Sequence, residues 1–205
     1  MGTLNVYCWF FFVSALIIGL ALPVLAVDLV EVKNIEVGSQ KPYKVADKSL
    51  DVGDVYYIDR QYTIISMPVE LKGGTWIMTA NDDKQSVGNG FLKFEVKNPV
   101  TVYVLRDSRG DNDKGGSPPQ WLSDNFEKVK DWKVEVTDSN MGFFTVWKSK
   151  ADFPAGKVEL GGNADPPAAG QGSHYVVVLF VGKKGLSVGL TGKLSTTWAK
   201  LKNER

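Results

Sequence analysis

Residues 56–84 read YYIDRQYTIISMPVELKGGTWIMTANDDK and predict two β-strands joined by a turn. The strands, Tyr56–Ser66 and Thr75–Ala80, are rich in tyrosine, isoleucine, threonine and tryptophan, which fit a pleated surface. Met67-Pro68 opens the turn and Gly73-Gly74 closes it, because proline fixes its own φ and glycine accepts a positive φ. This segment therefore indicates a β fold.

The sequence that follows continues the β pattern. Phe91–Lys97 alternates apolar residues with lysine and glutamate, which predicts a strand with one buried and one solvated face. Asn98-Pro99 predicts a tight turn into a second strand, Val100–Arg106. We predict that these two strands form an antiparallel hairpin.

The second half of the chain predicts the remaining strands. A short helical or irregular segment at 123–129 precedes strands at Trp132–Thr137, Phe143–Lys148 and Lys157–Leu160. The continuous apolar run His174–Val181 is typical of a central strand covered on both faces. About eight strands and no long amphipathic helix predict an all-β fold, an antiparallel β-sandwich of the jelly-roll or galactose-binding-like type, over residues 54–182.

The first 26 residues have the features of a secretory signal peptide. No charged side chain occurs before Asp28, an apolar run spans Tyr7–Leu22, and Pro23 precedes a small residue, Ala26, at the expected cleavage point. An uncleaved anchor is the alternative, because about 20 apolar residues would span a bilayer. After signal removal we expect no membrane association, a lead-in at 27–53 and a tail at 183–205.

Charge and cysteine content narrow the function. The chain has 24 basic and 23 acidic residues and a net charge of +1, which indicates neither nucleic acid nor an acidic partner. The single cysteine, Cys8, lies in the predicted signal peptide, so the mature chain has no thiol. Disulfides, cysteine metal sites and thiol catalysis are therefore excluded, and we expect the protein to be secreted, extracellular or periplasmic.

A series of short motifs carries a family resemblance. They are YIDR at 57–60, TANDDK at 79–84, FLKFEV at 91–96, VTVYV at 100–104, DSR at 107–109, PQWL at 119–122, DFPAGKVELGGN at 152–163 and a valine-rich strand at 175–181. In this order they resemble an accessory β-sandwich (jelly-roll) module of secreted bacterial proteins, of the kind appended to extracellular polysaccharide-active enzymes. The resemblance covers most of residues 54–181 and implies a binding role beside an enzyme. This chain departs from the pattern in an enlarged loop at 111–117.

The candidate ligand-binding residues combine aromatic and planar polar side chains. A sugar is held by flat aromatic faces and by groups that bond its hydroxyls. Trp121, Asp107 and Arg109 bracket one loop and can converge at one end of the sandwich, and Arg60 is the fourth candidate. Trp76 and Trp147 could add aromatic surface. The alternative is that the tryptophans are core residues and that Asp59-Arg60 and Asp107-Arg109 are structural ion pairs.

Two acidic clusters are candidate calcium sites. Asn81, Asp82 and Asp83 offer the oxygen ligands that calcium prefers, and residues 111–113 offer a similar set before Gly115. The alternative is that these side chains bond their own backbone in turns. We predict no other cofactor.

Two further features are expected to be structural. Arg109-Gly110-Asp111 forms an RGD tripeptide, but three residues carry little information about adhesion. His174, the single histidine, begins an apolar strand, which favours a packed histidine over a base or metal ligand.

The sequence favours a non-catalytic module that binds a polysaccharide or glycan. One alternative is a structural or surface-assembly protein that packs against a partner protein. A small polysaccharide hydrolase or lyase is the second alternative, but no G-x-S-x-G motif precedes a helix and no carboxylate pair stands out.

Overall fold

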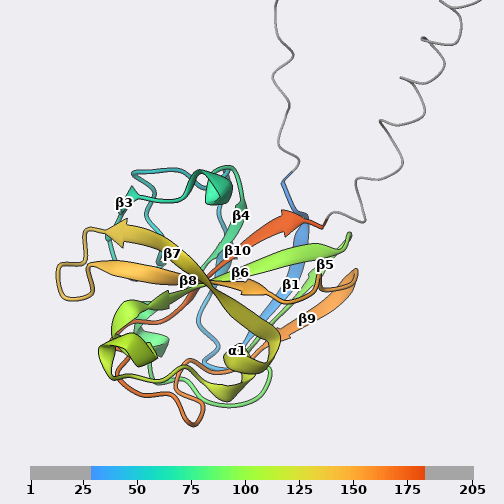
Figure 1. Ribbon diagram of the computed structural model, residues 1–205. Helices are drawn as coiled ribbons and strands as arrows, with labels where there is room; N and C mark the ends of the chain where they lie inside the picture. The colour runs from blue at the N-terminus through green and yellow to red at the C-terminus, as the bar shows by residue number, and fades with distance from the viewer. Residues whose placement is uncertain (1–28, 183–205) are drawn as a thin grey trace, which may run out of the picture.

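The computed structural model describes residues 29–182 as ten strands, one short α-helix and four single-turn 3-10 helices (Figure 1). The strands are β1 (Val32–Val37), β2 (Lys44–Val45), β3 (Ile64–Ser66), β4 (Thr75–Met78), β5 (Leu92–Val96), β6 (Val100–Asp107), β7 (Phe126–Val136), β8 (Phe143–Ser149), β9 (Gly156–Leu160) and β10 (Val176–Val181). The helices are α1 (Gln120–Asn125), η1 (Val69–Leu71), η2 (Asn81–Asp83), η3 (Ser108–Gly110) and η4 (Asn112–Lys114). The predicted signal peptide and the predicted tail at 183–205 lie outside the described residues.

Two antiparallel sheets form the sandwich. The small sheet has the order β1-β5-β9, and the large sheet has the order β2-β4-β10-β6-β8-β7-β3. In Figure 1 β1, β5 and β9 lie together on one side of the molecule, and the large sheet curls away from them. The predicted all-β antiparallel sandwich is confirmed. Within residues 29–182, no helix has the length and apolar character needed to cross a bilayer.

The central strand of the large sheet, β10, is covered on both faces. Val177 and Leu179 of β10 face a core shared with β5 and β9, whereas Val176 and Val178 face a second core under the segment that holds Tyr56, Ile64 and Leu71. The first four side chains of β10 are buried, and each buried valine or leucine stabilises the fold by about 1.5–3 kcal/mol. The prediction of a doubly covered central strand from the run at 174–181 is confirmed.

The hairpin predicted for residues 91–106 is wrong. β5 pairs with β1 and β9, whereas β6 pairs with β10 and β8 in the other sheet. The Asn98-Pro99 turn carries the chain across the sandwich, so the apolar faces of β5 and β6 meet through the core. Alternation fixes which side of a strand is buried, but it does not fix the strand's neighbours.

The strand predicted for Tyr56–Ser66 is mostly irregular. Only β3, its last three residues, is a strand, and Val55 and Tyr57 form isolated bridges to Thr63 and Thr79. The tyrosines are buried because the segment lies over the second core, where the Tyr56 and Tyr57 rings meet edge-on at 4.6 Å. Their burial, rather than a continuous ladder, explains the apolar composition.

Three segments differ from their predicted bounds. α1 begins at Gln120, three residues before the helical or irregular segment predicted at 123–129, and ends at Asn125, because β7 begins at Phe126 rather than at Trp132. A bulge interrupts β7 between Lys128 and Lys133, which hides the period of two in the sequence. The predicted lead-in at 27–53 contributes β1 to the small sheet and β2 to the large one.

Candidate functional site

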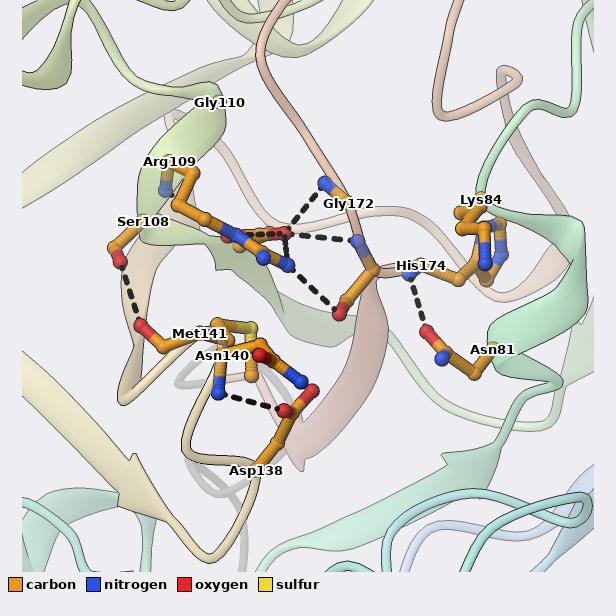
Figure 2. Close-up of polar contacts among 12 residues, drawn as sticks. Asn81, Lys84, Ser108, Arg109, Gly110, Asp138, Asn140, Met141, Gly172 and His174 are labelled. Carbon is orange, nitrogen blue, oxygen red and sulfur yellow. Dashed lines mark hydrogen bonds and ion pairs between the residues drawn. The ribbon is translucent and has the colours of Figure 1, made fainter.

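The loops that follow β4, β6 and β9 meet at one end of the sandwich, where Figure 2 shows Asn81, Arg109 and Gly172 near one another. Asp107, the last residue of β6, holds two of these loops together. Its Oδ1 accepts hydrogen bonds from the backbone N–H of Arg109 at 2.9 Å and from the Arg109 Nε at 3.0 Å. Its Oδ2 accepts from the Arg109 Nη2 and the Gly172 N–H, both at 2.7 Å, and from the Ser173 N–H at 2.8 Å. Asp107 is fully buried, so its carboxylate bonds other groups of the protein and is not accessible to a ligand.

Arg109 is the exposed partner of this ion pair. Its side chain is 35% exposed, and its Nη2 also donates to the Ser173 hydroxyl at 3.2 Å. Hydrogen bonding to Asp107 raises the pKa of the Arg109 guanidinium, which therefore stays charged. Asp107 and Arg109 therefore form a structural ion pair, which was the alternative to a sugar-binding role in the sequence analysis.

A second charged group lies beneath the same loop. Arg106 is 1% exposed and donates from Nη1 to the Asn163 Oδ1 and from Nη2 to the Ser117 carbonyl, both at 3.1 Å. Burial lowers the pKa of Arg106 to about 10, so it remains protonated at neutral pH. Asp111, also 1% exposed, lies 3.9 Å from the Arg106 Nε and 3.1 Å from the Lys128 Nζ. The carboxylate of the RGD tripeptide therefore lies inside the protein.

Arg60 belongs to a separate group of charges. It forms ion pairs with Asp82 and, at 3.5 Å, with Asp59, whose carboxylate accepts the backbone N–H groups of Asn81 and Asp82. Within residues 29–182, no hydrogen bond or ion pair links Arg60 to Arg109 or Trp121. The four predicted ligand residues therefore do not belong to one hydrogen-bonded group.

Each of the three predicted calcium ligands is directed at a different set of partners. The Asn81 Oδ1 accepts the His174 N–H at 3.2 Å, and Asp82 is paired with Arg60. The carboxylate of Asp83 accepts from Ser39, Lys41 and Tyr43 at 2.7–2.8 Å. Burial raises the pKa of Asp83, but these hydrogen bonds outweigh it and lower the pKa overall. Among residues 29–182, no group of three or more histidine, cysteine or acidic side chains is arranged to hold a metal ion, and calcium binding stays a prediction.

The other tryptophans proposed as aromatic surface are core residues. Trp76 is 2% exposed and packs in the core under residues 50–71, whereas Trp147 is 8% exposed and packs between the two sheets. Burial removes both indole faces from a ligand. The core interpretation, which the sequence left open, therefore applies to both residues.

His174 is fully buried, as expected for a packed histidine. Its ring stacks on Tyr175 with centroids 4.2 Å apart and meets Tyr43 and Phe91 edge-on. Burial lowers the pKa of His174 to about 3, because the nearby Asp83 carboxylate compensates only in part. The imidazole is neutral at physiological pH.

Trp121 is the predicted ligand residue with accessible aromatic surface. It lies on α1, where Pro119 precedes the helix and is tolerated because no partner for its missing N–H is needed. Its indole N–H donates to the Gly162 carbonyl at 2.9 Å, and its ring meets Phe126 and Tyr175 edge-on. Gly161 permits this close approach, because a Cβ there would lie 2.3 Å from the Trp121 Cδ1. The half-buried indole is therefore held in one orientation.

A cleft of about 240 Å³ lies beside this indole, at the edge formed by β9. Trp121 and Phe153 are its partly exposed apolar walls, and the side chains of Asn89, Asn125 and Glu159 are exposed around it. We call this hollow the Trp121 cleft. It offers an aromatic surface with amide and carboxylate groups that can bond hydroxyls.

The sequence did not identify the polar rim of this cleft. Glu159 is the solvated member of an alternating strand, which is the pattern of any surface charge. Asn89 and Asn125 come from a glycine-rich turn and from the end of α1. Only the close approach of Trp121 to Gly161 and Gly162, just after β9, places them around one indole.

No protein-family model matches this chain, and no curated protein matches it. Among solved structures, the chain is similar to a β-glucuronidase from glycoside hydrolase family 2, with a TM-score of 0.61 and 20% sequence identity. That alignment covers 74% of this chain and 15% of the β-glucuronidase chain. A GH138 enzyme targeting pectin rhamnogalacturonan II aligns with a TM-score of 0.42 and 14% identity, over 75% of this chain and 18% of the enzyme. At 20% identity the first likeness shows the fold alone, a fold that occurs within a glycoside hydrolase.

Proposed function

We propose that this chain is a non-catalytic carbohydrate-binding module and that the Trp121 cleft is its binding site. The observation that carries the proposal is the pairing of a rigidly held, half-exposed indole with three exposed polar side chains. An indole in this setting can cover the apolar face of a sugar ring, while Asn89, Asn125 and Glu159 bond its hydroxyls. The occurrence of the fold inside a β-glucuronidase supports a carbohydrate context.

The lining of the cleft supports a binding role rather than hydrolysis. Glycosidases act through two carboxyl groups on either side of the scissile bond. Among the described residues that line the cleft, Glu159 is the single acidic one. We also propose that the module acts outside the cytoplasm, after removal of the predicted signal peptide at residues 1–26.

Affinity electrophoresis through gels that contain neutral polysaccharides tests this site. The wild type should be retarded, and Glu159→Gln and Asn89→Ala should each weaken binding about tenfold, because a hydrogen bond to a charged or amide group contributes about 1–3 kcal/mol. Trp121→Ala should abolish retardation, with circular dichroism used to check that the variant remains folded.

Asn140→Ala provides the matched control. Asn140 is an exposed asparagine in the turn between β7 and β8, outside the cleft lining, so its removal should leave the mobility unchanged. Equal retardation of the wild type and the cleft variants would contradict the assignment of the site.

A structural module is the second candidate. It is favoured by the charged groups of Asp107, Arg109 and Arg106, which form hydrogen bonds within the protein. These groups stabilise loops and are not offered to a ligand. Absence of retardation in gels of every neutral and acidic polysaccharide tried would favour this second candidate.

A further inference from the structure

A row of side chains crosses the face of the large sheet that points away from the small sheet. Lys148 on β8 lies directly opposite Tyr103 on β6 and also opposite Glu127 on β7. Residues paired directly across strands project from the same face, so these three side chains are neighbours. Tyr103 packs in the core that residues 50–71 cover, and this row lies at its margin.

The bulge in β7 adds a second aromatic ring to this row. Register shifts between Lys128 and Lys133, and Asp131 takes a positive φ of 64° inside the bulge. The Trp132 ring then stacks on Tyr103 with centroids 6.2 Å apart and planes 15° from parallel. Phe180 also meets Tyr103 edge-on, with ring centroids 5.8 Å apart. Bulges re-aim side chains in this way and often lie at functional sites.

The stacked pair borders a hollow with several charged groups. The hollow has a volume of about 340 Å³, and its lining comprises Tyr103, Glu127, Lys128, Val129, Lys130, Trp132 and Lys148. A neighbouring hollow of about 260 Å³ shares Glu127 and Lys148 with it. We call the two together the β7–β8 groove.

Two cations of the groove are available to a ligand. Lys128 is held 3.1 Å from the buried Asp111. For Lys130 and Lys148, by contrast, the structure of residues 29–182 contains no side-chain hydrogen bond or ion pair, although Glu127 is adjacent. With Lys128 paired to the buried Asp111, Lys130 and Lys148 outnumber Glu127 and leave the main hollow an excess of positive charge. A parallel aromatic pair beside free ammonium groups fits a ligand that has both a flat apolar surface and a negative charge.

We propose that the β7–β8 groove binds an acidic polysaccharide, with a sugar ring against Trp132 and its carboxylate or sulfate at Lys148 and Lys130. This site is separate from the Trp121 cleft in residues and in ligand charge. The proposal goes beyond the function assigned to the cleft and does not depend on it. Neutral polysaccharides report on the cleft, and acidic ones report on the groove.

The sharpest test compares polygalacturonate with its fully methyl-esterified form, because the two share a backbone and differ in charge. Binding to polygalacturonate should be at least about tenfold tighter than to the ester and should weaken as salt rises from 0.05 to 0.5 M, since screening grows with ionic strength. Dextran sulfate against dextran distinguishes a sulfate from a carboxylate preference. The double variant Lys130→Gln/Lys148→Gln should bind about tenfold more weakly than the wild type to whichever acidic polymer the wild type binds.

Lys33→Gln with Lys97→Gln is the matched control, because it removes the same charge from exposed lysines near the β1–β5 side. It should retain acidic-polymer binding. Trp132→Ala should also weaken binding. If that variant does not fold, the Lys130→Gln/Lys148→Gln variant still tests the proposal. Equal affinity for each charged polymer and its neutral counterpart, equal losses in both lysine pairs, or tighter binding of single-stranded oligothymidylate would overturn the proposal.

Discussion

Acidification should destabilise the wild type relative to a His174→Phe variant by about 1.4 kcal/mol for each pH unit below 6.5. The folded-state pKa of His174 is lowered to about 3 by burial, whereas the unfolded chain has the ordinary value near 6.5. Between these values the unfolded state binds more protons, so stability is complete above pH 6.5 and declines as the pH falls toward 3. The total loss over that window is on the order of 4 kcal/mol.

Urea unfolding at pH 7.0, 6.0, 5.0 and 4.5 measures this effect. His174 is the single histidine of the chain, so the difference between the two proteins isolates its titration from that of the shared carboxylates. Phenylalanine keeps an aromatic ring beside Tyr175 and cannot bind a proton. Parallel stability curves for the two proteins would show that His174 becomes charged without cost in the folded state.

Asp107→Ala should lower the free energy of unfolding by about 3–5 kcal/mol, the cost of leaving a buried ion pair and its hydrogen bonds incomplete. The substitution removes the acceptor for Arg109 and for the backbone N–H groups of Gly172 and Ser173. Two loops from distant parts of the sequence lose their common anchor. Urea denaturation at pH 7 measures the change, with unchanged slopes confirming that the unfolding transition is comparable.

Asp82→Ala is the control for Asp107→Ala. Asp82 also pairs with an arginine, but its side chain is 52% exposed, and exposed ion pairs contribute about 0–1 kcal/mol. A loss below about 1 kcal/mol is therefore expected. Equal losses in the two variants would mean that Asp107 does not act as a buried anchor.

The fold class could be predicted because burial leaves a direct mark on composition. A central strand buried on both faces must be apolar throughout, and the run at 174–181 has that property. Strand neighbours leave no such mark. β5 alternates in the same way whether it pairs with β6 or faces it across the core, which is why the predicted hairpin was wrong.

The site could be predicted only in part, for a related physical reason. Asp107 and Arg109 are the residue types that bind a sugar and also those that form a buried ion pair. The choice between the two roles depends on backbone N–H groups 65 and 66 residues farther along the chain. Trp121 and Trp76 are alike in sequence, but the first lies at an open edge and the second beneath a covering segment. Trp132 became a candidate only through the bulge that places it on Tyr103.

Glycan binding at the Trp121 cleft is the central claim, and the indole N–H signals of the isotope-labelled protein test it most directly. The protein would be titrated with oligosaccharides cut from neutral polysaccharides while two-dimensional nuclear magnetic resonance spectra are recorded. We expect the Trp121 signal to shift in proportion to bound sugar, while those of the core residues Trp76 and Trp147 stay fixed. A Trp121 signal that no oligosaccharide moves, or core signals that move in its place, would contradict the account.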